Sequence, residues 1–115
     1  MPRPVYTADP SGIQEVANGP AGLRGWHIHN GTAAPMFVQF FDVAQAADVT
    51  LGTTPPDFVL AVQETSSIEA AWPDRAGPVG FTRGLCYAVT TENDNDTAPT
   101  YTTGPATGDV TLFLD

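Results

Sequence analysis

The sequence predicts an all-β protein, an antiparallel β-sandwich of Ig-like or jelly-roll-like type with about seven short strands. Two observations predict this class. Apolar and polar residues alternate within several short segments, which is the period of a strand with one face in a core. In addition, 11 Gly and 11 Pro divide the 115 residues into pieces too short for long helices. A chain of this length suits one domain with one core.

Residues 1–11 are expected to form an extended N-terminal arm, and residues 12–115 a single sandwich domain. Three prolines fall within the arm and restrict its backbone before it meets anything. A segment with a restricted backbone loses less conformational entropy when it binds a partner. The arm therefore predicts a contact surface for another protein, made by Pro2, Arg3, Pro4, Val5 and Tyr6.

Seven segments are expected to form strands, in the order 13–17, 23–30, 36–43, 58–62, 68–72, 85–91 and 110–114. In the second segment Leu23 and Trp26 are three residues apart, so in a regular strand their side chains would face opposite sides. A bulge at Gly25 is expected to turn both toward the core. Between the strands, segments 44–56 and 92–107 are long connections. The side chains expected in the core are Trp26, Ile28, Val38, Phe40, Phe58, Leu60, Leu85, Tyr87, Val89, Val110 and Leu112.

The strand 36–43 is apolar on both of its faces. Phe37 and Phe41 lie opposite Val38 and Phe40 in the alternation. A strand of this kind is either covered by a second layer or buried against a neighbouring chain. We expect Phe37 and Phe41 to form a protein–protein interface and the protein to be a homo-oligomer. The alternative is that the connections 44–56 and 92–107 fold over this face.

Two groups of residues could ligate a metal ion. His27 and His29 are two apart on a strand and project from one face, but the chain has no third histidine to join them. Asp94 and Asp96 lie in an oxygen-rich stretch, but the Gly and Glu of an EF-hand loop are missing from it. We expect solvent-facing or interface histidines, a solvated turn at 92–96, and no cofactor.

Signals for other functions are weak in this sequence. It contains no G-x-S-x-G, no P-loop and no G-x-G-x-x-G, and we expect no enzymatic activity. The single cysteine, Cys86, lies in an apolar strand and is expected to be a buried, inert thiol. Four arginines, no lysine and a net charge of −9 argue against nucleic-acid binding. No apolar run approaches the ~20 residues that span a bilayer, so no membrane partner is expected.

Three stretches resemble a group of short virion proteins of tailed bacteriophages: GWHIHNGTAAPMFVQFFDVA, PDFVLAVQ and GPVGFTRGLCYAVTTENDNDTAP. In that group a G-W-x-[IV]-x-N strand is followed by a strand ending F-[FY]-[DN] and by an F-x-x-G-[LI]-x-Y-A-[VI]-T strand. The match covers roughly residues 22–98, and its motifs are core patterns. The resemblance implies a structural protein of the virion surface that is assembled in the host cytoplasm. It implies a capsid decoration or cement protein bound to the major capsid protein, or a head or tail appendage.

Two other functions remain open at this stage. One is a receptor- or glycan-binding module of a tail or head fibre, with Trp72, Tyr101 and the loop acids lining a shallow site. The other is a small metal-binding β-sandwich that uses His27 and His29.

Overall fold

The computed structural model describes residues 3–8, 10, 12–71, 77–90 and 108–115. In this part of the chain it confirms an all-β antiparallel sandwich, with nine strands and one 3-10 turn. No helix among the described residues is long and apolar enough to cross a bilayer. The elements are β1 (Arg3–Ala8), β2 (Ile13–Ala17), β3 (Ala21–Asn30), β4 (Met36–Phe41), η1 (Ala46–Asp48), β5 (Phe58–Val62), β6 (Ser66–Ala71), β7 (Val79–Phe81), β8 (Leu85–Thr90) and β9 (Gly108–Leu114).

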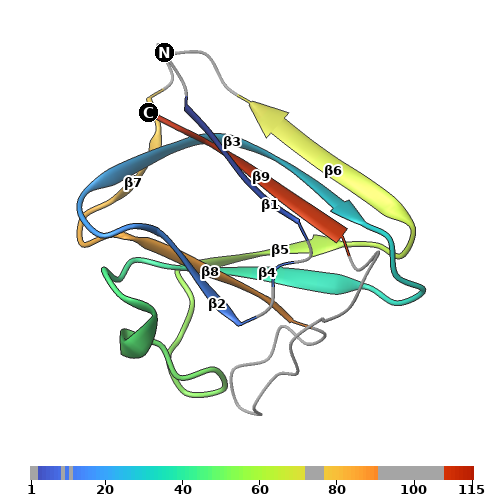
Figure 1. Cartoon of the computed structure of the whole chain (residues 1–115), viewed down its shortest axis with the longest axis horizontal. Coiled ribbons are helices and arrows are strands. Elements are labelled where there is room, and N and C mark those ends of the chain that lie inside the picture. Colours follow the sequence, from blue (N-terminus) through green and yellow to red (C-terminus); the bar gives the residue numbers. More distant parts are fainter. Residues whose placement is uncertain (1–2, 9, 11, 72–76, 91–107) are drawn as a thin grey trace.

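The strands form two sheets that face each other (Figure 1). One has the order β1-β9-β3-β6, with β7 pairing the start of β3 beyond β6. The other has the order β2-β8-β4-β5. Partners are nested along the chain, β1 with β9, β2 with β8, β3 with β6 and β4 with β5. A long hairpin rolled up in this way is the jelly-roll arrangement, one of the two sandwich types expected from the sequence.

The N-terminal arm is the main point where the fold differs from prediction. Residues 3–8 are extended, as expected, but they pair with β9 from Arg3 opposite Leu114 to Ala8 opposite Asp109. β1 is therefore an edge strand of the five-stranded sheet. An edge position tolerates Pro4, because one side of an edge strand makes no ladder hydrogen bonds. β1 and β7 are the two strands that the sequence did not predict, and they raise the number of strands in the described residues from seven to nine. Pro2 lies outside the described residues.

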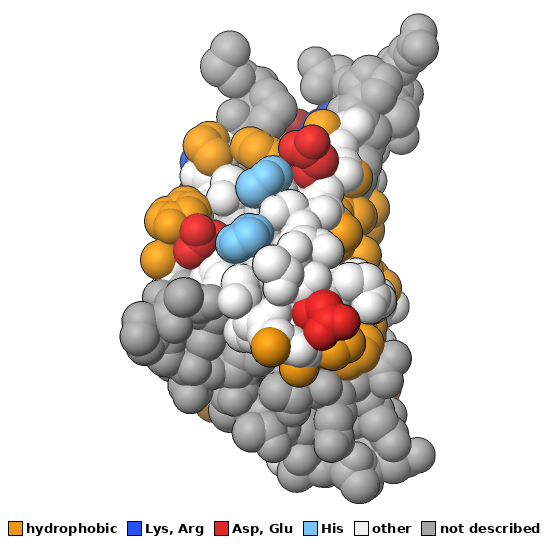
Figure 2. Space-filling model, turned by 90° about the vertical axis from the view of Figure 1, so that its right-hand side faces the viewer, with side chains coloured by type: hydrophobic (Ala, Val, Ile, Leu, Met, Phe, Trp, Pro, Cys, Tyr) orange, Lys and Arg blue, Asp and Glu red, His pale blue; other side chains and the backbone are white. Residues whose placement is uncertain are grey.

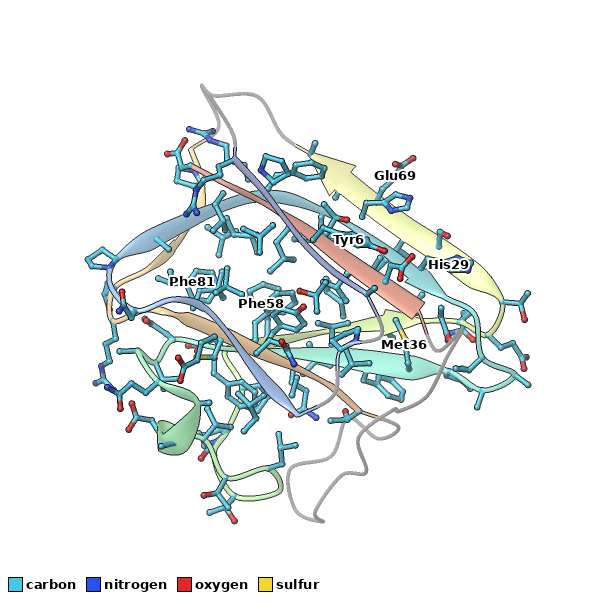
Figure 3. All side chains as sticks on the ribbon, viewed as in Figure 1. Tyr6, His29, Met36, Phe58, Glu69 and Phe81 are labelled. Carbon is cyan, nitrogen blue, oxygen red and sulfur yellow. The ribbon has the colours of Figure 1, made fainter. Side chains whose placement is uncertain are left out.

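The core lies between the two sheets and contains every side chain that the alternation predicted for it. Phe40 is fully buried and stacks on Phe58, with ring centroids 4.6 Å apart. Phe58 also contacts Trp26 and Phe81 through tilted rings. Figure 3 shows Met36, Phe58 and Phe81 projecting into the space between the sheets. Burial of these aromatic and aliphatic surfaces is the main favourable contribution to the stability of the fold.

The bulge expected at Gly25 is present. The register between β3 and β9 shifts between Leu23 and Gly25, so that both Leu23 and Ile28 are buried. Arg24 is 8% exposed, and its Nε donates a hydrogen bond to Asp115 Oδ1 at 3.1 Å. A Cβ at position 25 would lie 2.3 Å from the carbonyl oxygen of Ala70. Glycine is therefore required here by the close approach of β6.

A second apolar layer covers the far side of the four-stranded sheet, and it corrects the interface predicted for Phe41. Phe41 is 1% exposed and belongs to a cluster with Val49, Cys86 and Ala88. Ile13, Val43 and Leu51 pack against the same cluster. The connection 44–56 thus folds over this face, as the alternative interpretation of the sequence had it for this segment. The other connection of that alternative, 92–107, lies outside the described residues. Phe37 lies on the same face and is half-buried.

Asp42 anchors the end of β4. Its carboxylate accepts hydrogen bonds from the backbone N–H groups of Thr82, Arg83 and Gly84, at 3.1, 2.8 and 3.3 Å. Burial alone would raise the pKa of the Asp42 carboxyl, but these hydrogen bonds and that from the Thr82 hydroxyl outweigh it. The pKa is lowered from its usual 3.8. The ionised form of Asp42 therefore holds the β7–β8 turn against β4.

Candidate binding surface

The outward side of the five-stranded sheet carries a group of polar side chains placed by the strands. The register aligns them in cross-strand rows on β1, β9, β3 and β6. We call this surface the outer sheet face, and define it by Tyr6, His27, His29, Ser67, Glu69, Asp109, Thr111 and Phe113. Alternation turns the intervening residues toward the core.

Two rows carry most of the chemistry of the outer sheet face. In the first, Tyr6, Thr111, His27 and Glu69 follow one another across the four strands. In the second, Asp109, His29 and Ser67 are neighbours. His29 Nδ1 and Ser67 Oγ are hydrogen-bonded at 2.8 Å, which orients the imidazole on this exposed face. Figure 3 shows Glu69 and His29 pointing away from the sandwich interior.

The outer sheet face is acidic and aromatic at once. Figure 2 shows both histidines side by side, with an acidic side chain next to each of them. Tyr6 is 61% exposed, the most of any large apolar residue in the described part of the chain. None of the rows contains Lys or Arg. The described residues of this face therefore offer hydroxyl, carboxylate and imidazole groups beside aromatic rings, and no lysine or arginine is among them to attract phosphate.

A shallow hollow of about 390 Å³ lies next to the first row, where β6 ends. It is lined by Trp26, Glu69, Ala70, Ala71 and Phe113. In the register, Phe113 and Ala71 flank Gly25, which has no side chain to occupy the space between them. The hollow thus combines an aromatic side chain and a carboxylate with small neighbours, and its volume falls at the lower end of the range for small-molecule sites.

The structure bears on the predicted metal candidates in different ways. His27 and His29 share one exposed face, as the alternation predicted. Within the described residues, no group of three or more His, Cys, Asp or Glu is placed to hold a metal ion. Asp94 and Asp96 lie outside the described residues, as do Trp72 and Tyr101.

Cys86 is fully buried, as expected, and its Sγ lies 3.6 Å from the carbonyl oxygen of Val43. Burial, together with the negative charges of Glu15 and Asp48, raises the pKa of the thiol to about 11. A thiol of this kind is almost fully protonated at neutral pH, so it is a poor nucleophile and metal ligand.

The contact residues predicted from the sequence fall into two groups in the structure. Phe41 is interior and Phe37 half-buried, both on the far sheet. Arg3, Pro4 and Tyr6 are exposed on the edge strand, whereas Val5 packs against the core. Among the predicted contact residues that the structure describes, the exposed ones are Arg3, Pro4 and Tyr6 on β1.

Sequence reasoning missed Glu69, Asp109 and Phe113 as members of one surface. The alternation does place each of them opposite a core residue, so their outward direction could have been read. Their proximity depends on β6 and β9 flanking β3, which is a property of the topology.

No known protein family and no curated protein sequence matches this chain. Among solved structures, the chain is similar to the crystal structure of PirA, at 14% sequence identity and a TM-score of 0.43. That similarity covers 99% of this chain and 93% of the other. At this level of identity and TM-score the similarity carries no argument about function.

Proposed function

We propose that this chain is a non-enzymatic structural protein of a tailed-phage virion, a decoration or cement protein that binds the major capsid protein on the capsid surface. The resemblance of three sequence stretches to such virion proteins is the first support. The three stretches span β3, β4, β5, β7 and β8, of which β3, β4 and β8 lie in the interior of their sheets. Jelly-roll domains also occur in viral capsid proteins and in lectins, which is an analogy at the level of the fold.

The observation that carries the proposal is the position of β1. It is the last strand of its sheet in the described part of the chain, so one side of its backbone has no strand beside it. An edge strand of this kind can pair with an extended segment of another protein. It also presents Arg3, Pro4 and Tyr6, which belong to the contact set expected from the sequence. Attachment to the capsid protein is proposed to use this edge, with copies of the chain arranged as homo-oligomers on the particle.

The test is electron microscopy of the parent particle carrying an epitope-labelled copy of this chain. The proposal expects label at regular positions on the head and many copies per particle. Label on tail fibres alone would instead support a receptor- or glycan-binding module. Absence of the chain from purified particles would refute a virion role.

A matched pair of variants tests the attachment edge. Tyr6→Ala is expected to weaken decoration, because exposed aromatic residues often dominate contacts of this kind. Val79→Ala is the control, since Val79 is the other exposed large apolar residue in the described part and lies on β7. Equal decoration by both variants would place the attachment surface elsewhere.

A further inference from the structure

We infer that the hollow at the end of β6, together with the adjoining row of the outer sheet face, binds a neutral sugar ring. The inference goes beyond attachment to a virion and applies to the isolated protein. Its failure would leave the proposed attachment through β1 untouched.

The hollow has one wall suited to the apolar side of a sugar. Phe113 is half-buried, and Ala71 and Gly25 beside it in the register are small. The C–H groups on one side of a pyranose carry slight positive charge and pack on the negative face of an aromatic ring. Because a Cβ at position 25 would meet the Ala70 carbonyl oxygen, the backbone itself prevents a larger residue from occupying this part of the row.

The polar groups around the hollow suit hydroxyls. Glu69 lines it and is exposed, so its carboxylate can accept hydrogen bonds from two neighbouring hydroxyls. His27 lies beside Glu69 across the strands, and Thr111 lies beside His27. Imidazole and hydroxyl groups both donate and accept, as a ligand with several hydroxyl groups requires. The second row, with Asp109, His29 and Ser67, continues this polar surface for further rings of an oligosaccharide.

Charge selects a neutral sugar over an acidic one. The rows contain no Lys or Arg, while Glu69 and Asp109 are carboxylates on a chain of net charge −9. Sulfated, phosphorylated or uronic-acid ligands would meet repulsion from these carboxylates, and no lysine or arginine among the described residues of the rows compensates it. A basic peptide is the competing ligand, since a carboxylate beside an aromatic ring also suits a cation. Hydroxyl and imidazole groups along the rows favour the sugar, because sugar hydroxyls can use both their donors and their acceptors, whereas an ammonium group can use only the acceptors.

The experiment is saturation-transfer and chemical-shift NMR on the purified chain. The ligands are the methyl glycosides of glucose, galactose, mannose and N-acetylglucosamine, with methyl glucuronide and a lysine-rich peptide for comparison. The expected result is binding of at least one neutral glycoside, with shifts at the backbone amides of Gly25, Ala71 and Phe113. No binding of any neutral glycoside, or tighter binding of the glucuronide or the peptide, would overturn the inference.

Variants then locate the site. Glu69→Gln is expected to weaken binding roughly tenfold or more, because hydrogen bonds to a charged group are among the stronger ones. Phe113→Leu keeps an apolar side chain but removes the ring, and is expected to weaken binding as well. Glu64→Gln is the control, since Glu64 is an exposed carboxylate in the turn before β6 and away from the hollow. Unchanged affinity in Glu69→Gln and Phe113→Leu variants that remain folded would also overturn the inference.

Discussion

At the scale of single residues, Phe41 decides whether the far side of the four-stranded sheet is an interface or an interior. It is 1% exposed beneath the connection that carries Val49 and Leu51. Phe41→Asp would place a carboxylate in this cluster without a partner, and burying an unpaired charge is strongly unfavourable. We expect this variant to be unfolded in circular dichroism and heat denaturation.

A milder pair of substitutions compares the burial of Phe41 with that of Phe37 through the free energy of unfolding. Phe41→Ala is expected to cost about 3–5 kcal/mol, the range for deleting a buried aromatic side chain. Phe37→Ala on the same strand face should cost less, because Phe37 is only half-buried. Urea denaturation of both variants gives the comparison. Equal and small losses would mean that Phe41 is not enclosed by its own chain.

Asp42 gives a prediction about pH. Its carboxyl has a lowered pKa in the folded state, so it adds stability that is complete above the usual value of 3.8 and is lost as pH falls below it. Asp42→Asn cannot ionise and accepts fewer hydrogen bonds from residues 82–84, so it should cost on the order of 1 kcal/mol at neutral pH. Urea denaturation should show that the difference in free energy of unfolding between the parent protein and Asp42→Asn becomes smaller at acid pH. A difference that stays constant down to strongly acid pH would contradict this role for the carboxylate.

At the scale of elements, β1 is part of the sheet and not a detachable arm. Val5 packs against the core, and the whole of β1 pairs with β9. Removing residues 1–8 would expose one side of β9 along its full length. We therefore expect the truncated chain to unfold at a markedly lower temperature, together with any loss of attachment. A truncation that leaves the melting temperature unchanged would restore the view of an independent arm.

The two sheets also illustrate how much of the fold was readable from the sequence. The alternation of apolar and polar residues located the core side chains. The odd spacing between Leu23 and Trp26 predicted the bulge at Gly25. Both patterns are visible within a single strand, so the sequence alone was enough to read them. The pairing of β1 with β9 joins residues more than a hundred positions apart, and no local pattern encodes it. The same holds for the outer sheet face: the outward direction of Glu69 was readable, but its position beside His27 was not.

At the scale of the whole molecule, charge is the dominant property. A net charge of −9, with only four arginines as strong cations, makes copies of the chain repel one another in solution at neutral pH and so opposes non-specific aggregation. Near its isoelectric point, about 4.2, this repulsion disappears. We expect a sharp solubility minimum there, measured by light scattering against pH. Precipitation strongest at neutral pH would contradict it.

The position of β9 has a consequence for biosynthesis. β9 lies between β1 and β3, and its Val110, Leu112 and Leu114 are all buried in the core. Until the ribosome has released residue 114, the nascent chain has a gap in the middle of one sheet and leaves the core open on that side. Folding is therefore expected to wait for this segment, and a stop codon a few residues before it should yield a product that proteases degrade instead of a slightly shorter sandwich.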